Sequence, residues 1–246
     1  MQPDLVVVWP VHIDYPIFRR YIKRHRFLFS DVYICFSDQH EGKDLMNWIM
    51  FALGDLGIKF GFPKKREGDE DWRNVAMRDV WANFKTGWVL FTEPDFLHTG
   101  EDFYTRLFSN QESAYAYYEA ERIHPACLLA KKSDVLQTSM DVSANPGVYD
   151  HFGKLTQELK QIVEVKPLED IGLVKYKDYY HMTGLTHNYE RFEKGLIPTG
   201  LNDFIAYNSE AMKVLPQHTY FNEKEQAILK KYGHGPKEVP IYKFLL

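Results

Sequence analysis

The sequence predicts an α/β protein, a single domain built on a mostly parallel sheet that helices flank, with an irregular C-terminal part. Short, almost continuously apolar runs alternate along the first hundred residues with segments whose apolar residues recur every three or four positions. Strands without polar positions are typical of parallel sheets covered on both faces. The 246-residue chain is 45% hydrophobic and 26% charged, an ordinary balance for a globular domain.

Four apolar runs predict the strands of the first half, at residues 5–9, 32–36, 58–62 and 88–92. Pro10 ends the first run, because proline has no N–H to donate to a sheet. The periodic segments between the runs predict three helices, at residues 16–29, 45–56 and 72–84. Pro16 suits the first turn of a helix, and Gly87 follows the last one.

The pattern is weaker after residue 110. Apolar runs predict strands at residues 114–118, 126–130 and 163–165, and a periodic segment predicts a helix at residues 151–161. The last sixty residues hold many aromatic residues and a Gly-Pro-rich end. We expect them to be irregular and to pack against the first half rather than form a second domain.

Charge and cysteine content narrow the function classes. A net charge of −4 argues against a protein that coats nucleic acid by bulk electrostatics, although local basic clusters occur at residues 19–26 and 64–66. Cys35 and Cys127 lie in apolar runs and are interpreted as buried side chains in a reducing compartment. No segment has the length of a signal peptide's apolar region or a transmembrane helix, so we expect a cytoplasmic protein.

Ligands of doubly covered parallel sheets bind beyond the carboxyl ends of the strands. One of these ends carries Glu93-Pro-Asp95, directly after the run at residues 88–92. Residues i and i+2 of an extended chain point the same way, and Pro94 favours that conformation for Glu93. The two carboxylates therefore make a candidate site for Mg²⁺ or Mn²⁺, although a Glu-Pro-Asp turn on a solvated loop is the ordinary alternative.

The surroundings of this pair resemble a known family. The stretch from Ala76 to residue 96 resembles the central motif of GT-A fold glycosyltransferases, in particular family 2-like nucleotide-sugar transferases: an Ala-Arg-Asn helix, a Thr-Gly turn, an apolar strand and Asp-x-Asp. Arg78 precedes Gly87 by nine residues, as in that family, while Glu93 stands in place of the first Asp. The resemblance implies that Glu93 and Asp95 hold a metal ion and that Arg78 assists in donor binding.

The resemblance extends to the N-terminal strands. Pro10 and His12 match the loop that contacts the nucleotide, and Asp38 matches the acid that recognises its base. The resemblance implies a nucleotide-sugar-binding half at residues 1–110, with a UDP-sugar as the favoured donor. It also implies an acceptor-binding half with a C-terminal extension at residues 111–246. A histidine from the C-terminal part supplies a third metal ligand in many such enzymes, which implies His187 or His181 here. An imidazole ligand would favour Mn²⁺ over Mg²⁺.

The resemblance also implies a catalytic base for transfer with inversion. In the family this base is a carboxylate, and Asp150 matches its position. The competing interpretation is that Asp150 caps the N-terminus of a helix. Asp141 and Glu119 are alternative acids. The acceptor stays open between a carbohydrate, another small molecule, a protein and, as a minority option, a modified DNA base. Two rival functions also stay open: a sugar- or nucleotide-binding domain without turnover, and a sugar nucleotidyltransferase, which the absence of glycine after the first strand disfavours.

Overall fold

The structure is a computed structural model. It describes residues 2–8, 25–36, 56–61, 72–83, 87–93, 96–98, 102–110, 112–119, 122–144 and 151–181, together with 188, 191, 194–197 and 199–200. Most of the helices expected at residues 16–29 and 45–56 lies outside these residues, and so do residues 201–246. Residues 26–28 of the first expected helix form a 3-10 turn, η1 (Arg26–Leu28).

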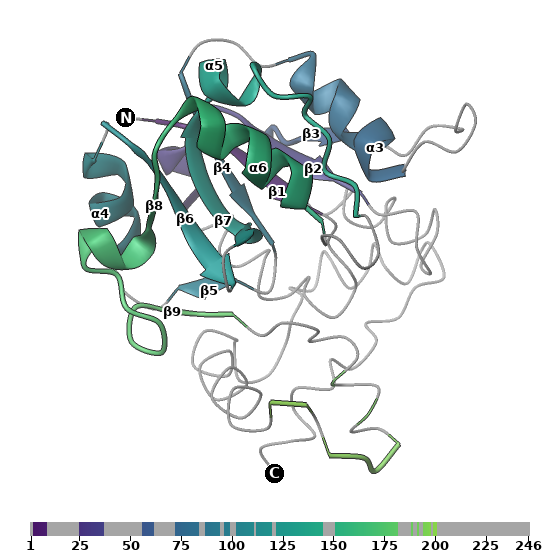
Figure 1. Cartoon of the computed structure of the whole chain (residues 1–246), viewed down its shortest axis with the longest axis vertical. Coiled ribbons are helices and arrows are strands. Elements are labelled where there is room, and N and C mark those ends of the chain that lie inside the picture. Colours follow the sequence, from purple (N-terminus) through teal and green to yellow (C-terminus); the bar gives the residue numbers. More distant parts are fainter. Residues whose placement is uncertain are drawn as a thin grey trace.

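A seven-stranded sheet forms the centre of the described structure (Figure 1). Its strands follow the order β3-β2-β1-β4-β7-β6-β8. Their bounds are β1 (Asp4–Val8), β2 (Val32–Cys35), β3 (Lys59–Gly61), β4 (Trp88–Thr92), β6 (Ala114–Glu119), β7 (Arg122–Lys131) and β8 (Val165–Pro167). Four of the six strand pairs are parallel, and only those of β7 with β4 and β6 are antiparallel. The predicted α/β class with a mostly parallel sheet is confirmed.

Side chains that alternate along the strands build a core on each face of the sheet. On one face Leu5 and Val7 of β1 pack with α4 (Phe103–Ser109) and η3 (Leu168–Ile171). On the other face Val6 and Val8 pack with α3 (Trp72–Trp81), α5 (Lys132–Val135) and α6 (Gly153–Ile162). Because both faces are covered, β1 is buried along its whole length, which explains the unbroken apolar run that follows Asp4.

A separate two-stranded sheet consists of β5 (Leu97–His98) and β9 (Tyr179–Tyr180), which pair antiparallel. In Figure 1 it lies at the lower end of the large sheet, near the carboxyl end of β4. The pairing of Leu97 with Tyr180 brings residue 181 close to the segment that follows β4. This small sheet therefore joins two parts of the sequence that are more than eighty residues apart.

The two cysteines lie on opposite faces of the sheet. Cys35 packs in the core that contains α3, where its Sγ lies 3.1 Å from Sδ of Met77, and Cys127 packs in the other core. Both are buried and free, as predicted. Burial raises the pKa of the Cys127 thiol, so this side chain is held protonated.

The element predictions that fall on described residues are largely confirmed in both halves, including the strands at residues 5–9 and 114–118 and the helix at 151–161. The strands at residues 32–36, 58–62 and 88–92 and the helix beginning at Trp72 are found with small differences at their ends. The strand predicted at 126–130 is longer, because β7 begins at Arg122 and includes Pro125. The strand predicted at 163–165 is shifted to β8, and α5, β5 and β9 were not predicted. No helix in the described part of the chain is long and apolar enough to cross a membrane.

Candidate metal centre

Glu93 occupies the carboxyl end of β4, where sheet topology favours ligand binding. The antiparallel register of β4 and β7 aligns Thr92 with Cys127, so the first residues of β7 continue past the end of β4. Thr92 Oγ1 fixes this junction by donating to the carbonyl of Ala126 at 3.1 Å. The reversed direction of β7 thus places His124 beside Glu93.

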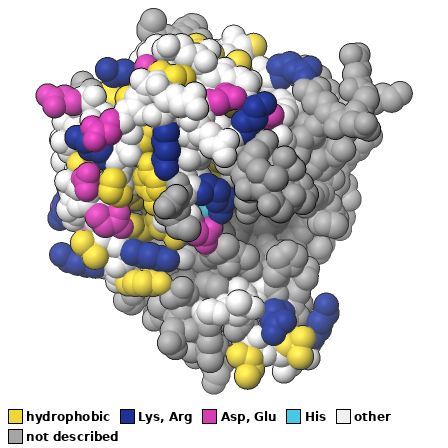
Figure 2. All heavy atoms as spheres, in the orientation of Figure 1, with side chains coloured by type: hydrophobic (Ala, Val, Ile, Leu, Met, Phe, Trp, Pro, Cys, Tyr) yellow, Lys and Arg dark blue, Asp and Glu magenta, His cyan; other side chains and the backbone are white. Residues whose placement is uncertain are grey.

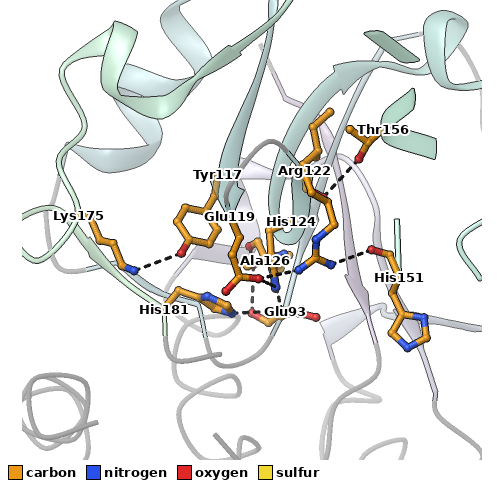
Figure 3. A network of polar contacts seen from close by, with 12 residues as sticks. Glu93, Tyr117, Glu119, Arg122, His124, Ala126, His151, Thr156, Lys175 and His181 are labelled. Atoms are coloured by element: carbon orange, nitrogen blue, oxygen red, sulfur yellow. Dashed lines mark hydrogen bonds and ion pairs between the residues drawn. The ribbon is translucent and has the colours of Figure 1, made fainter. Parts of the chain in front are cut away.

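Glu93, His124 and His181 converge on one point (Figure 3). One carboxylate oxygen, Oε2 of Glu93, lies 3.4 Å from Nδ1 of His124 and 3.4 Å from Nε2 of His181. The ligand atoms of the three residues all lie within 4.8 Å of one another. His181 directly follows β9, so the pairing of β9 with β5 delivers it to the cluster.

Two neighbours orient the ring of His124. The backbone N–H of Ala126 donates to its Nδ1 at 3.2 Å, which leaves Nδ1 without a proton and assigns the proton to Nε2. Nε2 in turn faces Oε2 of Glu119 at 3.5 Å. Arg122 holds that carboxylate at 2.6 Å and also donates to the backbone carbonyl of His151 at 3.1 Å. The ring is therefore fixed from both sides.

The electrostatics keep His124 neutral. Burial, reinforced by the positive charges of neighbouring groups including Arg122 and Lys175, lowers the pKa of His124 to about 2. At neutral pH its imidazole therefore carries no charge and retains a lone pair on one ring nitrogen, the form in which histidine binds metals. His124 and His181 are only 8% and 1% exposed at their side chains, and Glu93 is 20% exposed.

An aromatic wall backs the two histidines. The ring of Tyr117 on β6 lies 5.7 Å from that of His124 and 5.2 Å from that of His181, measured between centroids. The two imidazole rings are 4.4 Å apart. On its far side, the hydroxyl of Tyr117 accepts a hydrogen bond from Lys175 at 3.2 Å (Figure 3).

These residues fit a divalent cation. A carboxylate oxygen and two largely buried imidazoles place their ligand atoms within 4.8 Å of one another. Nδ1 of His124, the unprotonated nitrogen, would exchange its hydrogen bond from the Ala126 N–H for the cation. Mixed nitrogen and oxygen ligands suit Mn²⁺ better than Mg²⁺, which prefers oxygen alone. The fold and the cluster thus define an α/β protein with a candidate metal centre at the carboxyl end of its central sheet.

The structure brings together two of the residues expected at the site from sequence, Glu93 and His181. Arg78 lies exposed in the last turn of α3. The other expected site residues lie outside the described part of the chain: Pro10, His12, Asp38, Asp95, Asp150 and His187. Their predicted roles stay predictions.

His124 was not expected as a ligand. Its sequence, His-Pro-Ala-Cys at the start of an apolar run, shows only a strand boundary. The signal that identifies it is the register: once β7 is known to run antiparallel to β4 with Thr92 opposite Cys127, a side chain three residues before Cys127 must lie near the segment after Thr92.

The two alternative acids have different surroundings. Asp141 accepts hydrogen bonds from the Asn74 amide at 2.7 Å, the Ser143 hydroxyl at 2.5 Å and the Lys154 ammonium at 3.0 Å. Burial raises the pKa of Asp141, but these bonds outweigh burial and hold the pKa well below its usual value. Such a carboxylate is a poor proton acceptor. Glu119, in contrast, lies against the candidate metal centre and is engaged with Arg122 and His124.

No protein-family model matches the chain, and no curated protein sequence matches it. Similar solved structures include a mannosyltransferase from Pyrobaculum calidifontis in complex with GDP-Man and Mn²⁺, which is 12% identical with a TM-score of 0.49 over 100% of this chain and 79% of that one. Another is glucosyl-3-phosphoglycerate synthase from Mycobacterium tuberculosis in complex with Mn²⁺ and uridine-diphosphate-glucose, 11% identical with a TM-score of 0.41 over 81% of each chain.

A third similar structure is a 4-diphosphocytidyl-2C-methyl-D-erythritol synthase, 10% identical with a TM-score of 0.44 over 68% of this chain and 88% of that one. Glycosyltransferases, the class that the sequence resembles, are thus found among the solved structures similar to this chain. At these identities the likeness concerns the fold.

Proposed function

We propose that the protein is a metal-dependent glycosyltransferase that moves a sugar from a nucleotide-diphosphate donor to an acceptor hydroxyl. The observation that carries the proposal is the convergence of Glu93, His124 and His181 directly after β4. This is the position where the sequence motif implies the donor's metal ion. His124 was not part of that motif, and with it the centre consists of one carboxylate and two histidines. Asp95 and His187 are further predicted ligands of the same ion.

The residues of the centre have separable tasks in this proposal. Glu93, His124 and His181 hold Mn²⁺, which when bound would act as a Lewis acid that stabilises negative charge on the leaving diphosphate. Glu119 and Arg122 orient His124. Because Asp141 is committed to its own hydrogen bonds and Glu119 to His124, Asp150 stays the predicted base for the acceptor hydroxyl.

Metal binding tests the centre directly. Isothermal titration should show Mn²⁺ binding more tightly than Mg²⁺ to the wild type. Loss of a residue that only orients a metal ligand typically weakens metal binding by roughly 10- to 100-fold. Glu93→Gln and His181→Gln remove ligands themselves, so each should weaken Mn²⁺ binding by at least this factor. Glu164→Gln is the matched control, since Glu164 is 75% exposed at its side chain and pairs with Lys166 outside the centre. Equal Mn²⁺ affinities in Glu93→Gln and Glu164→Gln would refute the proposed metal centre.

Donor binding and turnover test the reaction. With Mn²⁺ present, a panel of nucleotide sugars should raise the melting temperature for the true donor only, with a UDP-sugar the first expectation. Mass action gives about 2.7 kcal/mol of stabilisation when the ligand is near 100 times its Kd. Slow Mn²⁺-dependent hydrolysis of the same donor should accompany binding and should be lost in Glu93→Gln. Donor binding without any hydrolysis or transfer would instead support a non-catalytic binding domain.

The acceptor is tested by transfer assays with carbohydrate acceptors and with DNA that contains a hydroxylated base. Figure 2 shows basic and acidic side chains intermixed over the described part of the face it displays, which favours a carbohydrate over a polyanion on that face. A DNA acceptor would make transfer fall steeply with salt, whereas a neutral carbohydrate would not.

A further inference from the structure

A hairpin at residues 174–180 displays a tyrosine in an unfavourable backbone conformation. Tyr176 has φ +68°, in the left-handed region that costs residues other than glycine about 1–2 kcal/mol. Its N–H donates to the carbonyl of Tyr179 at 2.8 Å, and its own carbonyl accepts from the hydroxyl of Tyr180 at 2.5 Å. The side chain that this backbone presents is 45% exposed.

The base of the hairpin is firmly anchored. The carboxylate of the buried Asp178 accepts a hydrogen bond from the backbone N–H of Val174 at 2.9 Å. The backbone N–H of Asp178 donates to the carbonyl of Val174 at 2.8 Å. The hydroxyl of Tyr179 donates to Glu169 at 2.7 Å. The exposed position of Tyr176 is therefore built into the fold rather than a feature of a loose loop.

Lys175 is held between two rings of this region. Its Nζ lies 5.5 Å from the ring centre of Tyr117 and 5.0 Å from that of Tyr176, and it donates to the Tyr117 hydroxyl at 3.2 Å. Within the described part of the chain, Lys175 forms no ion pair with a carboxylate. Aromatic rings orient a cation without neutralising it, so these two contacts leave the positive charge of the ammonium uncompensated.

This charge lies next to the candidate metal centre. Tyr117, the residue that Lys175 contacts, is the wall behind His124 and His181. Figure 3 shows Lys175 reaching Tyr117 from the side opposite to Arg122. The ammonium and the two histidines therefore contact the same aromatic residue, and the hairpin runs through β9 directly into His181.

We propose that Lys175 and Tyr176 form a phosphate-binding subsite beside the metal centre, in which Lys175 contacts a phosphate group and Tyr176 supports the sugar or base attached to it. A lysine ammonium binds phosphate as a point charge, and sugars and bases pack on exposed aromatic rings. The inference rests on the proposed function and extends it. The phosphate belongs either to the diphosphate of the donor or to a phosphorylated acceptor.

The test uses the full chain with pyrophosphate and inorganic phosphate as probes. Pyrophosphate is titrated with and without Mn²⁺, and inorganic phosphate is titrated into the metal-free protein and into the Mn²⁺–pyrophosphate complex. Lys175→Met keeps the packing of the side chain but removes its charge, and Lys175→Arg keeps the charge. Lys177→Met is the matched control on the same hairpin. Tyr176→Asn removes the ring but retains a residue that tolerates positive φ.

Lys175→Met should weaken one of the two probes by roughly 10- to 100-fold, the effect of losing one charged hydrogen bond. A loss for pyrophosphate assigns the subsite to the donor, and a loss for phosphate in the complex assigns it to the acceptor. Lys175→Arg should recover most of the affinity, and Lys177→Met should stay within about two-fold. With UDP titrated as a third probe, Tyr176→Asn should weaken the binding of UDP more than that of pyrophosphate without lowering the melting temperature.

The subsite is refuted if Lys175→Met binds both probes like the wild type, if Lys177→Met loses as much affinity as Lys175→Met, or if the wild type binds neither probe. Failure of the wild type to bind Mn²⁺ would count against the proposed function alone. The titrations without metal would then still decide whether Lys175 binds phosphate.

Discussion

At the scale of single residues, His124 shows how neighbours decide what a side chain can do. The Ala126 N–H fixes its tautomer and burial keeps it neutral, so it is suited to bind a metal and unsuited to act as an acid. Glu119, clamped by Arg122, faces the opposite nitrogen. Carboxylates in this position raise the basicity of a ligating histidine and hold its ring.

We therefore expect Glu119→Gln to lower Mn²⁺ affinity by roughly 10- to 100-fold while changing the melting temperature little. Titration calorimetry measures the affinity, and nitrogen chemical shifts of the His124 ring report its tautomer, which a merely structural role of Glu119 would leave unchanged. Glu112→Gln, at an exposed position, is the control. Unaltered affinity together with unaltered ring shifts would contradict the positioning role.

The predictability of the site also differs from residue to residue. Glu93 is a site prediction from sequence because a carboxylate directly after a buried strand sits where parallel sheets bind ligands. His181 was one of two candidates, and only the pairing of β9 with β5 shows how it reaches Glu93. His124 was not among the sequence candidates, since its place beside Glu93 depends on the direction and register of β7, and neither is encoded in the local pattern of residues 122–131.

At the scale of elements, Asp141 connects three parts of the chain. Its carboxylate accepts from Asn74 of α3, from Ser143 in the following loop and from Lys154 of α6. The side-chain oxygen of Asn74 also accepts a hydrogen bond from the backbone N–H of Val142, which joins α3 a second time to the segment that follows Asp141. The cluster therefore sets how α3 and α6 lie next to each other on one face of the sheet.

The pKa of Asp141 is lowered in the folded protein, so its contribution to stability is present above the unfolded pKa of about 3.8 and is lost as pH falls through the folded value. We expect Asp141→Asn to be less stable than the wild type by about 1–3 kcal/mol at pH 7, with the difference shrinking below pH 4. Urea unfolding across pH 3–7 measures this. Asp170→Asn, at an exposed site, should show no such trend.

Elements were predicted from sequence where they are long and apolar. β4 and α3 carry clear patterns, and both begin at the expected residues. β5 and β9 have two residues each and exist only through mutual pairing, while α5 has four residues, about one turn, which is too short for a periodic pattern.

At the scale of the whole molecule, one buried ion pair joins distant parts of the chain. Lys132, the first residue of α5, lies 2.5 Å from Asp4, the first residue of β1, and both side chains are about 5% exposed. The backbone N–H of Lys132 also donates to the carbonyl of Gly87 at 2.9 Å. Asp4 precedes the strand's apolar run, and nothing in its local sequence indicates a partner 128 residues away.

We expect Lys132→Met to cost about 3–5 kcal/mol, because it leaves the Asp4 carboxylate buried without its counter-charge. The double variant Asp4→Asn with Lys132→Met should recover much of this loss. Chemical denaturation of the wild type, both single variants and the double variant gives the coupling energy. Stabilities that simply add would show that the two side chains do not act as a pair.

The placement of the two cysteines has a practical consequence for labelling. Both thiols are buried on opposite sides of the sheet, and the pKa of Cys127 is raised, so neither offers a reactive thiolate at the surface. A cysteine introduced at an exposed position would therefore be the one that a maleimide dye modifies in the native protein. Lys177→Cys would put such a dye on the 174–180 hairpin, where its fluorescence would report each phosphate that arrives beside Lys175.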